Sequence, residues 1–126
     1  MKLYPADTEF SHFIRSRDGW RCRRCFKNYP PPTSALHNSH FFSRGKWGTR
    51  FDPDNCISLC YGCHSYFDHA GKAEYTLFKI NELGQKGFDY LTLRAWSKSP
   101  LGSNYWKKLT KKQAKEIFKE LTDATN

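Results

Sequence analysis

Four of the five cysteines fall into two Cys-x-x-Cys pairs, a pattern that binds zinc. Cys22 and Cys25 form the first pair and Cys60 and Cys63 the second, with 34 residues between the pairs. Four thiolates in two close pairs can surround one tetrahedral Zn²⁺. A single pair could be a redox site, but two pairs at this spacing indicate a structural ion, because sulfur fills all four positions. We therefore expect a four-cysteine zinc site that ties the ends of the intervening segment together.

The tied segment and the residue just after it carry polar side chains, two of them histidines, of types that could take part in hydrolysis. His40 and Asn55 lie inside the segment, and His64 directly follows the last cysteine. Hydrolysis needs a water molecule that is deprotonated near neutral pH, and histidine is the side chain with a matching pKa. The zinc knot would carry all three residues on one piece of chain. This arrangement suggests a metal-dependent nuclease.

The charge of the chain favours a nucleic-acid partner. The 126 residues have a formal net charge of +9, and aromatic residues make up 17%, as expected for one globular domain with an aromatic-rich core. Counting four thiolates and one zinc ion lowers the charge to about +7, which is still basic. A small basic domain binds polyanions through phosphate contacts and counterion release. The alternative is a basic surface that only keeps the protein in solution.

The remaining cysteine and the absence of long apolar runs indicate the cellular compartment expected for the protein. Cys56 makes the cysteine count odd, which suits four ligands and one spare thiol better than a set of disulfides. No apolar run reaches membrane-spanning length, and the N-terminus does not match a secretory signal. We therefore expect a cytoplasmic protein without membrane association, in a compartment where disulfides are rare.

The elements that must position these residues are short strands and helices. A strand is expected over 35–42, carrying His40, and a second over 56–59, leading into the second cysteine pair. A helix that begins at this pair carries His64. Three consecutive prolines, 30–32, predict an extended connector before the first strand. Hydrophobic spacing predicts further helices over 7–17, 72–83, 88–97 and 111–122.

Local signals set the boundaries of the later helices. Gly84 is expected to stop the helix over 72–83, whose apolar face includes Leu77. Thr110 and Gln113 form a capping box that starts the last helix, which has a buried stripe of Ile117, Phe118 and Leu121. The prediction is a single α+β domain, 1–126, with a core over 18–70 and a C-terminal helical extension over 71–126.

As a set, these motifs resemble the HNH family of ββα-metal (His-Me finger) nucleases. They are especially similar to phage-borne members, including the NinG/Rap-like recombination endonucleases of lambdoid phages. The resemblance implies a ββα-metal core with a four-cysteine zinc knot and flanking helices, and a phage-encoded origin. The matching stretches are Arg17-Asp18-Gly19-Trp20-Arg21-Cys22, Ser39-His40-Phe41-Phe42-Ser43-Arg44, Arg50-Phe51-Asp52-Pro53-Asp54-Asn55 and Leu59-Cys60-Tyr61-Gly62-Cys63-His64.

The resemblance also implies a role for each residue of the motif. His40 is the general base, Asn55 holds the loop and orients the base, and His64 is a ligand of a catalytic divalent ion. Mg²⁺ is the expected ion, with Mn²⁺ as a substitute. Ser39 stands where many members have an Asp or His ligand. His37, or else solvent and phosphate oxygens, is expected to replace that ligand.

Basic residues close to the motif are expected to contact phosphate. Arg44 and Arg50 would flank the cut bond, with Lys46 assisting. A second group around the first cysteine pair is also expected to meet phosphates rather than to form a solvated collar: Arg15, Arg17, Arg21, Arg23 and Arg24.

The expected function is a divalent-metal-dependent endonuclease that nicks or cuts duplex or branched DNA. Paired cuts would need a second active site, which a homodimer would supply. One alternative is a zinc-stabilised DNA-binding module without cleavage activity. The presence of Ser39, where many members of the family have an Asp or His ligand, favours this alternative. Another is a zinc domain that binds protein partners, against which the density of arginines argues.

Overall fold

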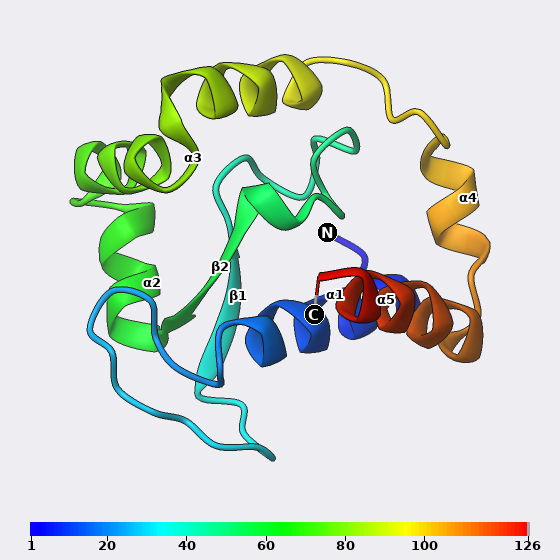
Figure 1. Ribbon diagram of the computed structural model, residues 1–126, viewed down its shortest axis with the longest axis horizontal. Coiled ribbons are helices and arrows are strands. Elements are labelled where there is room, and N and C mark those ends of the chain that lie inside the picture. Colours follow the sequence, from blue (N-terminus) through cyan, green and yellow to red (C-terminus); the bar gives the residue numbers. More distant parts are fainter. Residues whose placement is uncertain (126) are drawn as a thin grey trace.

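A two-stranded antiparallel sheet lies at the centre of the computed structural model, between α2 and α3 on one side and α1 and α5 on the other (Figure 1). The structure describes residues 1–125. The chain is a mixed α+β fold, as predicted. In chain order the elements are α1 (Pro5–Arg17), β1 (Leu36–His40), the 3-10 turn η1 (Pro53–Asn55), β2 (Cys56–Cys60), α2 (Tyr61–Asp68), α3 (Lys72–Ala95), α4 (Ser103–Lys108) and α5 (Lys111–Thr125).

The sheet and α2 form one continuous unit. β1 pairs with β2 so that Leu36 lies opposite Cys60 and His40 lies opposite Cys56. α2 begins at the residue after β2, which places His64 within its first turns. Both predicted strands and the helix that carries His64 are confirmed, with β1 shorter than expected.

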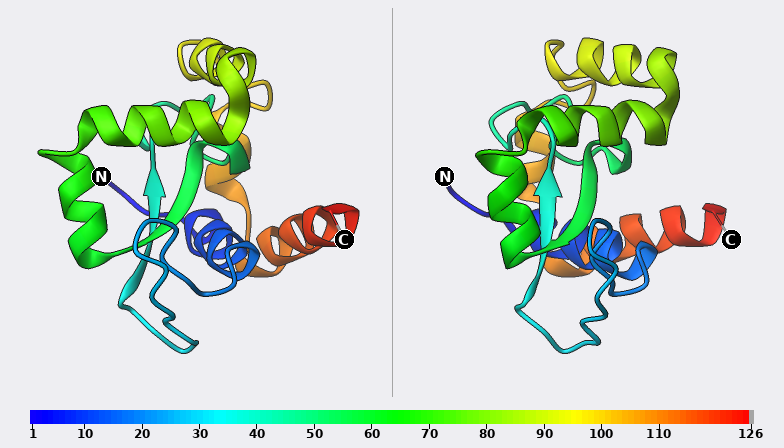
Figure 2. Two further views of the ribbon diagram at one scale, coloured as in Figure 1. Left: turned by 60° about the vertical axis from the view of Figure 1, so that its left-hand side comes forward. Right: turned by 90° about the vertical axis from the view of Figure 1, so that its left-hand side faces the viewer.

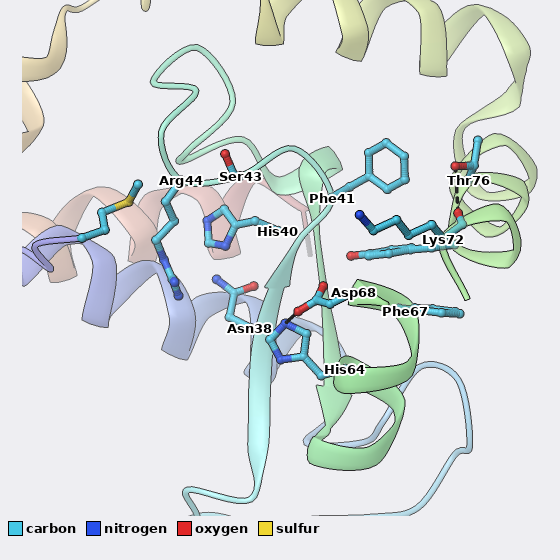
Figure 3. A pocket seen from close by; sticks show the side chains of 12 residues that line it. Asn38, His40, Phe41, Ser43, Arg44, His64, Phe67, Asp68, Lys72 and Thr76 are labelled. Carbon is cyan, nitrogen blue, oxygen red and sulfur yellow. Dashed lines mark hydrogen bonds and ion pairs between the residues drawn. The ribbon is translucent and has the colours of Figure 1, made fainter. Parts of the chain in front are cut away.

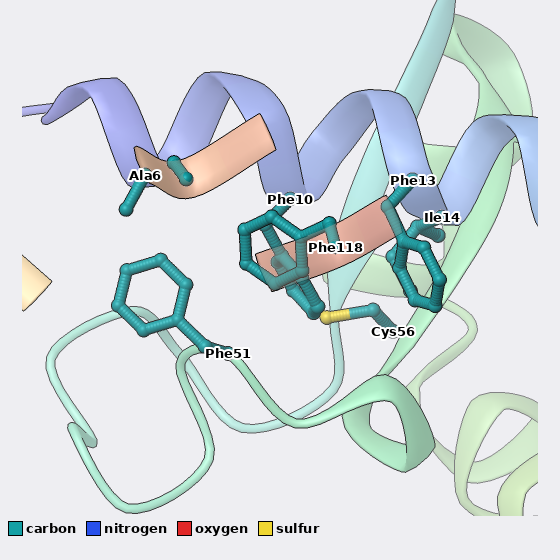
Figure 4. Close-up of a cluster of buried hydrophobic side chains, with 8 residues drawn as sticks. Ala6, Phe10, Phe13, Ile14, Phe51, Cys56 and Phe118 are labelled. Atoms are coloured by element: carbon teal, nitrogen blue, oxygen red, sulfur yellow. The ribbon is translucent and has the colours of Figure 1, made fainter. Parts of the chain in front are cut away.

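An aromatic cluster joins α1 to α5 (Figure 4). Phe10 of α1 lies 5.4 Å from Phe118 of α5 and 5.7 Å from Phe51, measured between ring centroids. The capping box at the start of α5 is confirmed, because the Gln113 backbone N–H donates to the Thr110 hydroxyl over 3.1 Å and the reciprocal bond is 2.9 Å. Leu121, predicted in the buried stripe, is 38% exposed.

α3 bends at Gly84, where the sequence predicted a helix end. Gly84 has φ 75° and ψ 163°, which lie outside the helical region and which glycine adopts at little cost. The two halves of α3 therefore run in different directions (Figure 2). The predicted apolar face is wrong, because Leu77 is 61% exposed and the buried residues of the first half are Tyr75 and Lys79. These two side chains face α2 and the loop before β2 instead.

α4 was not predicted from the sequence. Trp106 within it stacks on Phe51 at 4.2 Å, so tertiary packing holds this short helix against the aromatic cluster. Among the described residues, no helix combines the length and the apolar character needed to cross a membrane.

Candidate metal centre and active-site pocket

The four cysteines of the two pairs lie together in space. Their Sγ atoms are all within 4.8 Å of one another, and those of Cys25 and Cys60 are 3.9 Å apart. Sulfur atoms bound about 2.3 Å from a tetrahedral zinc ion are about 3.8 Å from each other, so the cluster fits one ion. Cys22, Cys25, Cys60 and Cys63 can therefore hold a metal ion such as zinc, as their spacing predicted.

The surroundings of this cluster lower the pKa of one of its thiols and raise the pKa of another. Burial opposes ionisation of Cys22, but backbone N–H groups of Cys25, Cys60 and Arg24 lower its pKa to about 7. Burial raises the pKa of Cys63 to about 12, although the Arg24 guanidinium lies 3.5 Å from its Sγ. A bound cation would favour the thiolate form of all four, so metal binding and folding are coupled here.

The arginines beside the first cysteine pair bind the protein itself. Arg24 pairs with Glu74 at 2.8 Å, and Arg23 pairs with Glu82 at 2.7 Å. Arg17 donates to the Cys56 carbonyl over 2.7 Å. Arg15 and Arg21 also donate to backbone carbonyls. Because these guanidinium groups bind carboxylates of α3 or backbone carbonyls of the protein, we assign them a structural role in place of the predicted phosphate contacts.

A cavity of about 670 Å³ opens beside β1, between the loop that follows this strand and the helices α2 and α3 (Figure 3). His40 and His64, two of the three predicted motif residues, both line it. Its other polar walls come from residues of four segments: Asn38, Ser43, Arg44, Asp68, Lys72, Tyr75 and Thr76.

His40 is held in one orientation by a backbone carbonyl. Its Nε2 lies 2.9 Å from the carbonyl oxygen of Arg50. A carbonyl can only accept, so Nε2 must carry the proton and Nδ1 is left as the acceptor. Burial and then the charge of Arg44 lower the pKa of His40 to about 4, so the ring is neutral at physiological pH. This is the state that a general base requires.

Asn55 fixes the loop that supplies this carbonyl. The side chain is fully buried and accepts from the Phe42 N–H over 2.9 Å. Its amide also donates to the carbonyls of Phe42 and Thr49, at 2.9 and 3.1 Å. The Thr49 carbonyl is one residue from Arg50, so Asn55 holds the backbone that orients His40. Asn55 is not among the residues that line the pocket, so its contacts with it are through the loop backbone.

Arg50 belongs to the interior, which contradicts its predicted phosphate contact. The residue is 1% exposed, and its Nε and one terminal nitrogen bind the two carboxylate oxygens of Asp7 at 2.9 and 2.8 Å. It also donates to the Lys2 and Arg44 carbonyls. Its guanidinium therefore anchors the loop after β1 to α1. Lys46 lies apart from the pocket, with its ammonium 3.5 Å above the Trp96 ring.

Asp7→Asn is expected to lower the free energy of unfolding by about 3–5 kcal/mol, because it leaves the buried Arg50 charge without its partner. Urea denaturation at neutral pH measures the change. Glu9→Gln is the matched control, since Glu9 lies on the same helix and is nearly as buried. Equal stability losses in the two variants would contradict a special role for the Asp7–Arg50 pair.

His64 has neighbours at both ring nitrogens. Its Nδ1 lies 3.1 Å from Nδ1 of His37, and its Nε2 lies 3.3 Å from a carboxylate oxygen of Asp68, one turn further along α2. His37 is not among the residues that line the pocket, whereas Asp68 is. Ser39 is fully buried and bonds the Tyr75 hydroxyl at 2.8 Å, so it packs against α3 and supplies no ligand.

Sequence reasoning missed several of the polar pocket residues, among them Asn38, Asp68 and Lys72. Asp68 had a usable signal, because residues four apart on a helix share a face and Asp68 follows His64 by four. Asn38 stands two residues before His40 on the strand, a spacing that puts both on one face. Lys72 had no signal, because it reaches the pocket only through the packing of α3.

The burial of His40 predicts a pH-dependent loss of stability. Its pKa in the folded protein, about 4, lies below the value of about 6.5 expected for an unfolded chain. The unfolded state therefore takes up the proton first, and stability falls as the pH drops from about 6.5 to about 4, by up to about 3 kcal/mol. Denaturation of the native protein and His40→Gln at several pH values measures this difference. Identical pH slopes for the two proteins would contradict it.

In comparisons with known proteins, no protein-family model matches the chain, and neither does any curated protein or solved structure.

Proposed function

We propose that this protein is a divalent-metal-dependent DNA endonuclease of the HNH type, stabilised by zinc at the four cysteines. The observation that carries the proposal is the pocket shared by His40 and His64. One histidine has its Nδ1 kept free as an acceptor by the Arg50 carbonyl, and the other presents a ring nitrogen beside a carboxylate. A β-hairpin followed directly by a helix brings the two together.

In this proposal His40 takes a proton from water at Nδ1. The water oxygen attacks phosphorus, the bond from phosphorus to the leaving sugar oxygen breaks, and that oxygen takes a proton from solvent. The Arg50 carbonyl accepts from Nε2–H throughout and stabilises the imidazolium that forms. His64 would hold the divalent ion, Mg²⁺ or Mn²⁺, which neutralises charge on the phosphate and the leaving oxygen when bound.

Arg44 and Lys72 are suited to hold the substrate phosphate. The Arg44 Nε is buried at the pocket and has no hydrogen-bond partner among the described residues, so it is a donor ready for an acceptor. Lys72 reaches the same pocket from α3, on the opposite wall (Figure 3). A phosphate on Arg44 would offset the positive charge that lowers the pKa of His40, so substrate binding would make the base stronger.

DNA is the proposed substrate because the chain carries a net charge of +9. The cytoplasm of a host cell is the proposed location, and a homodimer the proposed form for paired cuts. The second candidate is a DNA-binding module without cleavage activity. The burial of Ser39 favours it, because this residue supplies no ligand where the HNH family has one.

The test is incubation of the zinc-loaded protein with supercoiled plasmid and with a four-way DNA junction, with Mg²⁺, with Mn²⁺ or with EDTA. Nicked or linear product that depends on the divalent ion would support the nuclease. Salt-sensitive DNA binding without strand breaks under any of these conditions would favour the binding module. If the protein neither cleaves nor binds DNA at moderate salt, the proposed action on DNA would be overturned.

A further inference from the structure

Asn38 has an unexplained polar atom at the pocket. The residue is 6% exposed, and its side-chain oxygen Oδ1 is buried without a hydrogen-bond partner among the described residues. Figure 3 shows the Asn38 amide at the pocket wall between His40 and His64. Leaving a buried carbonyl oxygen without a hydrogen bond destabilises the protein. A ligand in the pocket that accepts electron pairs or donates a hydrogen bond would remove this cost.

Two further electron-pair donors belong to residues that line the same pocket. His64 Nε2 and Asp68 Oδ2 are 3.3 Å apart, and both residues line the pocket with Asn38. Two ligands about 2.1 Å from one cation, at an angle near 90–100°, are about 3.0–3.3 Å apart. The His64–Asp68 separation therefore matches two neighbouring ligands on one divalent ion. An amide oxygen, a carboxylate and an imidazole suit Mg²⁺ or Mn²⁺.

We propose that the catalytic ion is held by His64 Nε2, Asp68 and the Asn38 side-chain oxygen, and that His37 orients His64 instead of binding the ion. This inference rests on the proposed nuclease function and replaces the ligand pair His37 and His64 expected from the sequence. In this arrangement His64 donates from Nδ1–H to His37 Nδ1 over 3.1 Å, which leaves the Nε2 lone pair directed at the pocket.

The placement of His37 favours the ligand set of the proposal over the pair of His37 and His64. An ion between the two Nδ1 atoms would lie on the side of His64 turned away from Asp68. His37 does not line the cavity that contains His40, whereas Asn38 and Asp68 do. An ion that acts on the same phosphate as His40 must be reached from that cavity. The ring–ring contact of His37 with Tyr61 further fits a supporting position at the edge of the site.

The test uses Mn²⁺ alone, added to zinc-loaded protein without DNA. Loss of the free Mn²⁺ signal in electron paramagnetic resonance gives the dissociation constant, and electron spin echo modulation counts the bound imidazoles. We expect one Mn²⁺ per chain with a single imidazole coupling, which His64→Gln removes and His37→Gln retains. A signal from two imidazoles, one of them lost in His37→Gln, would overturn the proposal.

Variants of the oxygen ligands complete the test. Asp68→Asn is expected to weaken Mn²⁺ binding by about tenfold or more, and Asn38→Leu by about tenfold. Asn38→Asp is expected to tighten Mn²⁺ binding, because aspartate offers a charged oxygen at the same place. If Asn38 had only a structural role, this variant would bind Mn²⁺ no more tightly than the native protein. Asp89→Asn, an exposed carboxylate remote from the pocket, is the control and should change nothing.

Thermal melting confirms that each variant is folded before its affinity is compared. Unchanged affinity in both Asn38 variants, or no Mn²⁺ bound to the native protein, would overturn the proposed site. Because binding is measured without DNA, its outcome is separate from that of the nuclease assay. The expected binding pattern without strand cleavage would leave the ion site standing and reject the proposed function.

Discussion

His40→Gln is expected to lower the rate of metal-dependent strand cleavage by about 10²- to 10⁴-fold, the contribution typical of a general base. Glutamine places an amide nitrogen close to the position of the histidine Nε2, so it can still donate to the Arg50 carbonyl, 2.9 Å away in the native protein. It offers no basic nitrogen at the position of Nδ1. Single-turnover nicking of supercoiled plasmid, with protein in excess over DNA, measures the loss.

His69→Gln is the control for this experiment. His69 is exposed and bonds the Ser65 carbonyl on the outer side of α2, so its replacement should leave the rate unchanged. DNA binding and zinc content should be the same in both variants and in the native protein. A His40→Gln protein that cleaves at the native rate would show that another group, or the ion with its own bound water, supplies the base.

Removal of zinc is expected to unfold the segment between the cysteine pairs. Structural zinc contributes about 10–16 kcal/mol of apparent binding free energy in small zinc domains. Whole domains have a net stability of only about 5–15 kcal/mol. Cys22→Ser, at a fully buried ligand position, should therefore abolish cooperative unfolding and release the ion. Circular dichroism melting and zinc release to a chromogenic chelator measure the two effects.

Cys56→Ala separates zinc binding from simple loss of a buried thiol. Cys56 is also fully buried, but it lies in the aromatic cluster between α1 and α5 and burial raises the pKa of its thiol. We expect this variant to retain one zinc ion per chain and to lose only about 1–2 kcal/mol of stability through poorer packing. A stable, cooperatively folding Cys22→Ser protein without zinc would show that the cysteine cluster is dispensable for the fold.

Structural features that depend only on residues close together in the sequence could be predicted from the sequence. Two close cysteine pairs have few stable partners other than one tetrahedral ion, and the structure brings all four sulfur atoms together. The capping box of Thr110 and Gln113 and the bend at Gly84 follow from backbone chemistry within a few residues. His64 lies on α2 because the helix begins where the strand ends. These features need no knowledge of distant contacts.

The roles of the charged residues were decided only by the tertiary structure. Arg50 and Arg44 look alike in the sequence, yet Arg50 is buried against Asp7, 43 residues away, while Arg44 keeps an unpaired donor at the pocket. Arg23 and Arg24, between the first two cysteines, likewise pair with carboxylates on α3. A long charged side chain can reach either solvent or a distant partner, and sequence spacing does not distinguish the two.

Dependence on residues distant in the sequence also explains why some pocket residues were not predicted. Asn38, Asp68 and Lys72 come from a strand, a helix end and the start of another helix, and only packing brings them around one cavity. The sequence by itself determined the four cysteines that can hold a metal ion, and the strand and helix that carry His40 and His64. The tertiary structure decided which side chains face these histidines, because the free energy of burying a polar group depends on the partner it meets.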